Sequence, residues 1–323
     1  MKAAVYRRFG PPEVVQIEEV GKPVPKVNEV LIKVRAASVN PLDAGLMKGK
    51  PHSFRILFGL SKPRLTRPGV DVAGQVEAVG RNVAQFKPGD EVFGSCRGAF
   101  AEYVCASESK LAMKPDNVTF EQAASVPVAA FTALQGLRDK GHIQPGQRVL
   151  INGAAGGVGT FAVQIAKSFG AEVTGVCSAR NVGMVRSIGA DHVIDYTRED
   201  FTKCGQRYDL IFDCVGNHSL SACRRVLEPK GILIIAGEMS GRGMFGILAR
   251  VITALVQSRF MSQKAVTFLA RPNKGDLLIM HSLMEAGKVK PVIDRRYKLH
   301  EVSDAIRYLE EKHARGKVLI TLE

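Results

Sequence analysis

The chain is poor in cysteine, and its cysteines are not spaced for disulfide or metal chemistry. It contains six of them. No two form a CxxC pair, and their spacings match neither a small disulfide scaffold nor a zinc knuckle. We therefore expect reduced thiols, which are typical of an intracellular, cytoplasmic protein.

Long apolar runs are also absent. No run approaches the roughly 18 residues that a membrane span needs. Residues 1–10 lack the apolar core and cleavage site of a secretory signal. Residues 244–260 are apolar but carry Arg250 and Arg259. For this segment two alternatives stay open: an amphipathic helix on a membrane surface, or a helix packed against the first domain or a second copy of the chain. Membrane association, if present, is expected to be peripheral.

Acidic residues are in deficit. The 45 Lys+Arg exceed the 31 Asp+Glu and leave a net charge of +14. A polyanion or an anionic surface is therefore a possible partner. Nothing in the sequence resembles a nucleic-acid-binding module, so no nucleic-acid partner is expected. The 323 residues, 46% hydrophobic and 24% charged, indicate an ordinary globular chain of about two domains and exclude a disordered one.

Up to about residue 115 the sequence is a series of short strand patterns separated by Gly/Pro turns. No long amphipathic helix pattern interrupts them, which favours an all-β, barrel-like domain. The predicted strands are 3–6, 14–18, 29–36, 70–79, 91–94 and 101–104.

From Thr119 onward the pattern changes to alternating strands and helices. Thr119 and Gln122 form a capping-box pattern that predicts a helix start. Apolar strands that alternate with helices predict a parallel, doubly wound sheet with right-handed crossovers. The predicted strands are 149–151, 172–176, 193–194, 209–212 and 231–236, and the predicted helices are 158–169 and 182–188. A final amphipathic helix around 302–309 and a strand over 318–322 are too short for a domain, so we expect them to complete the first one.

The segment 151–159 follows a predicted buried strand and opens a helix. It reads Ile-Asn-Gly-Ala-Ala-Gly-Gly-Val-Gly and matches the dinucleotide-binding G-x-G-x-x-G pattern with Ala154 in place of the first glycine. In such a loop a pyrophosphate rests on the N-terminus of the helix. A tight turn without ligand is the alternative. The residues expected to bind the cofactor here are Ala154, Ala155, Gly156, Gly157, Val158 and Gly159.

The end of the next predicted strand favours NADPH over NADH. NAD-dependent proteins usually place an acidic residue about 20 residues after the loop, to bind the ribose hydroxyls. Here the sequence is Cys-Ser-Ala-Arg over 177–180. Ser178 and the guanidinium of Arg180 can bind a 2′-phosphate, which no carboxylate would then repel. Alternatively, Arg180 is a solvated residue at a helix start.

Several motifs in a fixed order extend over essentially the whole chain: MKAAVYRRFG at 1–10, ASVNPLD at 37–43, RPGVDVAG at 67–74, PGDEVFG at 88–94, the loop at 151–159 and GKVL at 316–319. In these motifs the chain resembles the zinc-free quinone oxidoreductase branch of the medium-chain dehydrogenase/reductase superfamily. The resemblance implies an α/β fold in which a GroES-like β-barrel catalytic domain, residues 1–120 completed by 270–323, accompanies a Rossmann NADPH-binding domain, residues 121–269. It also implies a homodimer.

The resemblance further implies that the protein works without zinc. Zinc alcohol dehydrogenases of this superfamily bind a catalytic zinc through Cys, His and Cys. The matching positions here are Asn40, Val70 and Val128, and valine cannot ligate a metal. We therefore expect hydride transfer from NADPH to a quinone or to an activated α,β-unsaturated carbonyl. The alternative is a non-catalytic NADPH-binding adaptor or membrane-surface protein.

Candidate site residues follow from the same resemblance. Asn40 is the candidate hydrogen-bond donor to the charge that develops on the acceptor oxygen, with a purely structural amide as the alternative. Asp43 is expected to order the same loop or to contact the substrate. His52, water or a ribose hydroxyl could supply the proton. The remaining residues expected near the cofactor are Thr132, Tyr196, Cys214, Val215, Gly216, Ala236, Gly237, Phe268, Leu269 and Lys317. For Lys317 the alternative is an ordinary surface lysine.

Overall fold

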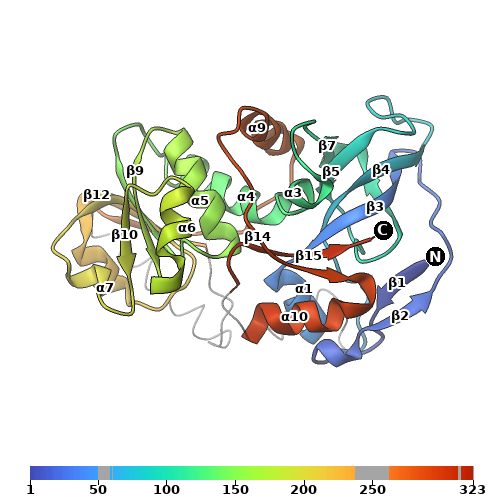
Figure 1. Cartoon of the computed structure of the whole chain (residues 1–323), viewed down its shortest axis with the longest axis horizontal. Helices are drawn as coiled ribbons and strands as arrows, with labels where there is room; N and C mark the ends of the chain where they lie inside the picture. Colours follow the sequence, from blue (N-terminus) through green and yellow to red (C-terminus); the bar gives the residue numbers. More distant parts are fainter. Residues whose placement is uncertain (50–58, 60, 237–261, 312–313, 323) are drawn as a thin grey trace. The chain divides into compact units, whose positions relative to one another are not determined.

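The computed structural model describes residues 1–49, 59, 61–236, 262–311 and 314–322 (Figure 1). The chain forms two compact units. Unit 1 consists of Met1–Val128, Pro272–Gly287 and Pro291–Glu323, and unit 2 of Ala129–Arg271 and Lys288–Lys290. The sequence-based boundaries, 1–120 with 270–323 and 121–269, lie near these divisions. His52, Gly237 and the segment 244–260 lie outside the described residues.

Unit 1 is built on a largely antiparallel sheet. Its strands are β1 (Lys2–Val5), β2 (Gln16–Glu19), β3 (Glu29–Val39), β4 (Asp71–Val79), β5 (Glu91–Ser95), β6 (Tyr103–Ser107), β7 (Leu111–Met113), β14 (Ile293–Lys298) and β15 (Lys317–Thr321). The order in the large sheet is β14-β15-β3-β4-β5-β7, with β6 paired to β3, while β1 and β2 form a separate pair. Because β15 runs antiparallel to β3, the end of the chain belongs to unit 1.

Strand β3 organises this unit. It is rich in valine, isoleucine, leucine and alanine; most of its residues are buried, and several of them belong to the core of this unit. It pairs with β4, β6 and β15. The register places Ser38 opposite Asp71 on β4, and Val39 opposite Val318 on β15. Polar residues at the end of β3 therefore meet residues that are far away in the sequence.

The helices of unit 1 are α1 (Pro41–Lys48), α3 (Phe120–Ala124), α9 (Lys274–Glu285) and α10 (Val302–Glu311). The capping box predicted at the start of α3 is confirmed: Gln122 N donates to Thr119 Oγ1 over 3.2 Å, and Thr119 N donates to Gln122 Oε1 over 2.9 Å. The interpretation of the first half as all-β was wrong at α1. This helix has Asn40 at its N-cap, Pro41 in its first turn and Asp43 at its third position.

Unit 2 contains a parallel sheet with the strand order β10-β9-β8-β11-β12-β13, the order of a Rossmann fold. Its strands are β8 (Arg148–Asn152), β9 (Glu172–Cys177), β10 (His192–Asp195), β11 (Tyr208–Asp213), β12 (Leu227–Ile235) and β13 (Lys264–Thr267). Its helices are α5 (Gly157–Ser168), α6 (Val182–Ser187) and α7 (Leu220–Arg225), and α4 (Pro127–Gln135) begins in unit 1 and continues here. A π-helical turn over Gly136–Lys140 follows α4.

The strand order of unit 2 reverses between β8 and β11. Chain connections leave these two strands in opposite directions, so a crevice opens beyond their carboxyl ends, where open α/β sheets bind ligands. The turns after β8 and β11 therefore lie where a ligand is expected to bind. Within the described residues, no helix is long and apolar enough to cross a bilayer.

Candidate functional site

The turn from β8 into α5 has the backbone geometry of a phosphate-binding loop. Gly153 takes a φ of +86°, in the left-handed region that favours glycine. A Cβ on Gly159 would collide with the carbonyl oxygen of Gly153, so the helix and the turn can approach this closely only with glycine there. Ala154 replaces a motif glycine without strain, because the left-handed conformation falls on Gly153 instead. The whole predicted segment 154–159 lies in this turn and the first turn of α5.

Helix α5 begins at this turn without a side-chain cap. Its N-cap is Gly156, and no side chain of the described residues accepts a hydrogen bond from its first turn. The uncapped N–H groups at a helix start carry partial positive charge and favour an anion. The turn therefore fits the pyrophosphate of a dinucleotide.

The ends of β9 and β10 bring the predicted 2′-phosphate residues to one edge of the sheet. Cys177, the last residue of β9, pairs with Asp195, the last residue of β10. Ser178 directly follows β9, and Tyr196 directly follows β10 and donates its backbone N–H to Cys177 O over 3.0 Å. Arg180 lies exposed two residues beyond Ser178, and Tyr196 is 52% exposed. Their positions fit an adenosine phosphate at this edge.

Asp195 is a carboxylate at this edge that the sequence interpretation did not consider. Its Oδ1 accepts hydrogen bonds from Thr197 N over 3.1 Å and from Thr197 Oγ1 over 2.8 Å. Desolvation acts to raise the pKa of Asp195, but these bonds, the charge of Arg198 and a bond from the backbone of Ala179 lower it overall. The carboxylate is thus engaged in holding the turn after β10.

A buried carboxylate ties the ends of β8 and β11 together. Asp213 Oδ1 accepts hydrogen bonds from Asn152 Nδ2 over 2.8 Å, from Val215 N over 3.0 Å and from Gly216 N over 2.9 Å. Cys214 N donates to Asn152 O over 3.0 Å. The predicted cofactor segment 214–216 is therefore held in a fixed turn across the point where the strand order reverses. Sequence patterns alone did not single out Asp213 or Asn152.

The remaining predicted cofactor residues of unit 2 lie along the same carboxyl edge or on α4. Ala236 follows β12 and donates its N–H to Asp213 O over 2.9 Å. Thr132 is a half-buried residue of α4. A Cβ on Gly136 would lie 2.4 Å from Phe212 Cε2 and 3.0 Å from Phe268 Cζ, so this glycine makes room for both phenylalanine rings. Leu269 is 85% exposed.

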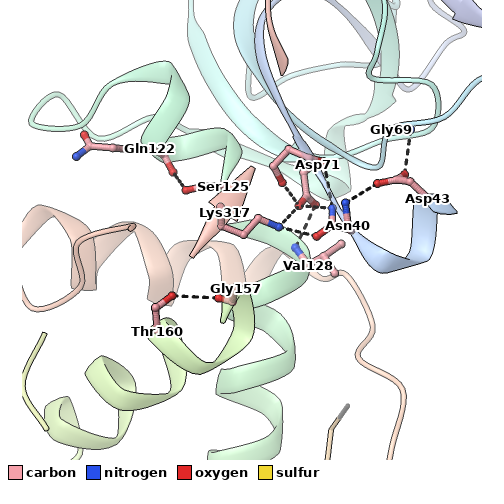
Figure 2. Close-up of polar contacts among 11 residues, drawn as sticks. Asn40, Asp43, Gly69, Asp71, Gln122, Ser125, Val128, Gly157, Thr160 and Lys317 are labelled. Carbon is pink, nitrogen blue, oxygen red and sulfur yellow. Dashed lines mark hydrogen bonds and ion pairs between the residues drawn. The ribbon is translucent and has the colours of Figure 1, made fainter. Parts of the chain in front are cut away.

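Unit 1 contains a buried polar cluster around Asp71 (Figure 2). Asp71 Oδ2 accepts hydrogen bonds from Ser38 Oγ over 2.7 Å and from Asn40 Nδ2 over 2.9 Å. Its Oδ1 accepts from Val128 N over 3.1 Å. Lys317 Nζ donates to Asn40 Oδ1 over 2.6 Å and lies 3.7 Å from Asp71 Oδ2. Four segments of the chain therefore meet at one carboxylate.

The charged residues of this cluster are almost completely removed from water. The side chain of Asp71 is 0% exposed and that of Lys317 is 4% exposed. Burial raises the pKa of Asp71 and lowers that of Lys317, and the opposite charge of each partner counteracts the shift. The predicted contact of Lys317 with the cofactor stays a prediction. In the described residues its ammonium is held by Asn40 and Asp71.

Asp43 orders the loop between β3 and α1. Its Oδ2 accepts from Asn40 N over 2.8 Å, and its Oδ1 accepts from Gly69 N over 3.0 Å. Burial raises the pKa of Asp43 to about 7 despite these two bonds. The geometry therefore gives Asp43 the first of its two expected roles, and a contact with substrate stays a prediction.

The positions that match zinc ligands in zinc alcohol dehydrogenases do not fit a zinc ion here. Val70 and Val128 have no ligating side-chain atom, and the Oδ1 of Asn40 accepts from Lys317. In the part of the chain that the structure describes, no three His, Cys, Asp or Glu side chains gather as a metal site would require.

Comparisons with known proteins identify the family. The model of the alcohol dehydrogenase GroES-like domain matches residues 26–116, and that of the zinc-binding dehydrogenases matches residues 188–320. The NADPH-dependent alkenal/one oxidoreductase of Arabidopsis thaliana chloroplasts is 35% identical over 99% of this chain and 79% of its own length. The chain belongs to the medium-chain dehydrogenase/reductase superfamily.

Two solved structures of this superfamily resemble the whole chain. The quinone oxidoreductase from Coxiella burnetii has a TM-score of 0.88 and 32% identity, over 100% of this chain and 99% of its own. The Escherichia coli quinone oxidoreductase complexed with NADPH has a TM-score of 0.84 and 26% identity, over 100% of both chains. The predicted fold class, a GroES-like domain with a Rossmann-type parallel sheet, and the resemblance to quinone oxidoreductases are confirmed.

Proposed function

We propose that the protein is an NADPH-dependent reductase that acts on a quinone or on the C=C bond of an α,β-unsaturated carbonyl, without a metal ion. The uncapped β8–α5 turn, with Ser178 and Arg180 at the end of the neighbouring strand, is the observation that carries this proposal. A relative named for alkenals and enones and structural neighbours named for quinones support both acceptor classes.

The residues of unit 2 would hold NADPH along one edge of the sheet. The N–H groups at the start of α5 would bind the pyrophosphate, and Ser178 and Arg180 the 2′-phosphate. Tyr196 would line the adenosine side. When bound, NADPH supplies the hydride. The turn over 214–216, which Asp213 fixes, together with Thr132, Ala236 and Phe268, would line the rest of the cofactor.

Unit 1 supplies a polar group for the charge that the acceptor oxygen gains. Asn40 Nδ2 donates to Asp71 over 2.9 Å and to Ser38 O over 3.2 Å. The longer bond is the one that the acceptor oxygen would replace, which makes Asn40 a donor toward developing negative charge. Because the positions of Val70 and Val128 supply no metal ligand, we propose acceptors that need no Lewis acid.

We also propose a cytoplasmic homodimer. Strand β13 is the last strand on its side of the described sheet, and an edge strand can pair with a second copy of the chain. For the segment 244–260, which lies outside the described residues, contact with a partner subunit and peripheral membrane contact remain the two alternatives.

NADPH consumption with a panel of acceptors tests the proposed reaction. The panel contains a naphthoquinone, a benzoquinone, a short enal and a long-chain enone, each with NADPH and with NADH. We expect turnover with at least one acceptor and a preference for NADPH. Tight NADPH binding without turnover on any acceptor would contradict the proposal and favour the non-catalytic adaptor.

A further inference from the structure

The Asn40 side chain is held between a group that can only donate and a group that can only accept. The ammonium of Lys317 has no acceptor, so the atom 2.6 Å away must be the amide oxygen, Oδ1. The ionised carboxylate of Asp71 has no donor, so the atom 2.9 Å away must be the amide nitrogen, Nδ2. The ion pair thereby permits one orientation of the amide and excludes the flipped one.

Asn40 occupies a position at which an asparagine side chain usually caps the following helix, but contacts with Lys317 and Asp71 set the direction of its amide. Asn40 is the N-cap residue of α1, and the N–H of Asp43 donates to the backbone oxygen of Asn40 over 3.0 Å. A capping side chain typically stabilises a helix by about 1 kcal/mol. Instead, the amide points to Lys317 and Asp71, as Figure 2 shows. The local sequence therefore does not set its direction; contacts with β4 and β15 do.

The ammonium also polarises the amide. A hydrogen bond from a cation to Oδ1 draws electron density toward oxygen and makes the Nδ2 hydrogens better donors, in a surrounding of low dielectric constant. The ion pair itself is buried, and replacing such a pair by neutral groups is often neutral for stability. Its effect on Asn40 can therefore be separated from its effect on folding.

We propose that Lys317 and Asp71 are positioning residues that orient and polarise the Asn40 amide so that Nδ2 faces the acceptor oxygen. This inference rests on the proposed function, in which Asn40 donates to the charge that develops on the acceptor. It gives Lys317 a role in turnover rather than in cofactor binding.

Two variants separate positioning from folding: Lys317→Met and the double variant Lys317→Met/Asp71→Asn. Lys317→Met leaves the buried Asp71 charge without a cation, so we expect a lower Tm. It also releases the amide, so we expect kcat to fall by about tenfold or more, while the Kd for NADPH changes less than about twofold. In the double variant the buried charge is gone, so Tm should recover while kcat stays low.

Lys114→Met is the matched control. Lys114 is a second buried lysine of unit 1, with a side chain 7% exposed. It lies 3.0 Å from Glu91 and donates to the carbonyl oxygens of Pro115 and Val118. It contacts none of the cluster around Asp71 in the described residues. Its replacement should lower Tm and leave kcat unchanged.

When the unsubstituted protein is active, four results would overturn the inference. Unchanged kcat in Lys317→Met would show that the ammonium does not act on turnover. Recovery of kcat together with Tm in the double variant, or an equal loss of kcat in Lys114→Met, would show a purely structural role. A large rise in the NADPH Kd of Lys317→Met would assign Lys317 to cofactor binding. Absence of turnover in the unsubstituted protein would overturn both the proposed function and this inference.

Discussion

At the scale of single residues, burial and polar contacts shift the pKa values of the buried ionisable side chains of unit 1 in opposite directions. Asp71 and Lys317 are buried together, so each offsets part of the desolvation of the other. Asp43 is also buried, but its hydrogen-bond donors among the described residues are the backbone N–H groups of Asn40 and Gly69. These neutral donors do not outweigh desolvation, and the pKa of Asp43 rises to about 7.

The raised pKa of Asp43 predicts a pH dependence of stability. In the unfolded chain this carboxyl loses its proton near pH 4, roughly its ordinary pKa. In the folded protein it keeps the proton until about pH 7. The folded state therefore binds more protons within this window, and the free energy of unfolding contributed by Asp43 falls as the pH rises from about 4 to 7.

Urea unfolding of the parent and of Asp43→Asn at several pH values measures this effect, because asparagine does not titrate. We expect the stability of the variant, relative to the parent, to improve steadily from about pH 4 to about pH 7 and then to level off. If the free energies of unfolding of the parent and the variant changed in parallel over this range, the pKa of Asp43 would not be raised in the folded protein.

Arg180 predicts the cofactor preference. A charge-assisted hydrogen bond contributes about 1.5–3 kcal/mol, so Arg180→Ala should weaken NADPH binding by roughly ten- to hundredfold and leave NADH binding unchanged. Fluorescence titration with both cofactors measures this. Arg186→Ala, which removes an exposed arginine of α6, is the control and should bind both cofactors as the parent does. Equal losses for NADPH and NADH in Arg180→Ala would refute the 2′-phosphate assignment.

At the scale of elements, two glycines of the β8–α5 turn have different tasks. Gly159 packs so closely on Gly153 that a Cβ would collide with a backbone oxygen. At Gly156 a Cβ would lie 3.5 Å from Gly153 O, an ordinary contact, and the backbone there is extended. Gly159 is thus required by packing within the protein, whereas Gly156 leaves space where the pyrophosphate would approach.

Because Gly159 is tightly packed and Gly156 is not, we expect different results for Gly159→Ala and Gly156→Ala. Gly159→Ala should destabilise the protein by about 1–3 kcal/mol through overpacking and also weaken NADPH binding. Gly156→Ala should keep the parent Tm but weaken NADPH binding, because the new methyl group occupies the approach to the helix start. Thermal unfolding and NADPH titration of both variants check this. If Gly156→Ala bound NADPH normally, the pyrophosphate would not lie on this turn.

At the scale of the whole molecule, the sequence predicted the fold best where apolar residues repeat at a regular spacing within one element. The apolar strands and the helices between them predicted the Rossmann-type sheet, and the amphipathic spacing of Val302, Ala305 and Ile306 predicted α10, where all three are buried. Helix α1 was missed because it is eight residues long and contains a glycine. The signal that could have found it is Asn-Pro-x-Asp at 40–43, an N-cap pattern.

The polar clusters could not be predicted because their members are far apart in the sequence. Asn40 and Lys317 are separated by 277 residues, and Asn152 and Asp213 by 61. Only the registers of β3 with β4 and β15, and of β8 with β11, bring them together. The family resemblance pointed to Asn40, but not to the charged partners that set its direction.

Direct hydride transfer is tested most simply by isotope labelling. The protein is incubated with an enone and NADPH that carries deuterium at the transferred position of the nicotinamide, and the product is analysed by mass spectrometry and NMR. We expect a product with a reduced C=C bond and one deuterium at the carbon β to the carbonyl, formed at an undiminished rate in the presence of a metal chelator. A product without deuterium, or a reaction that the chelator abolishes, would contradict this expectation.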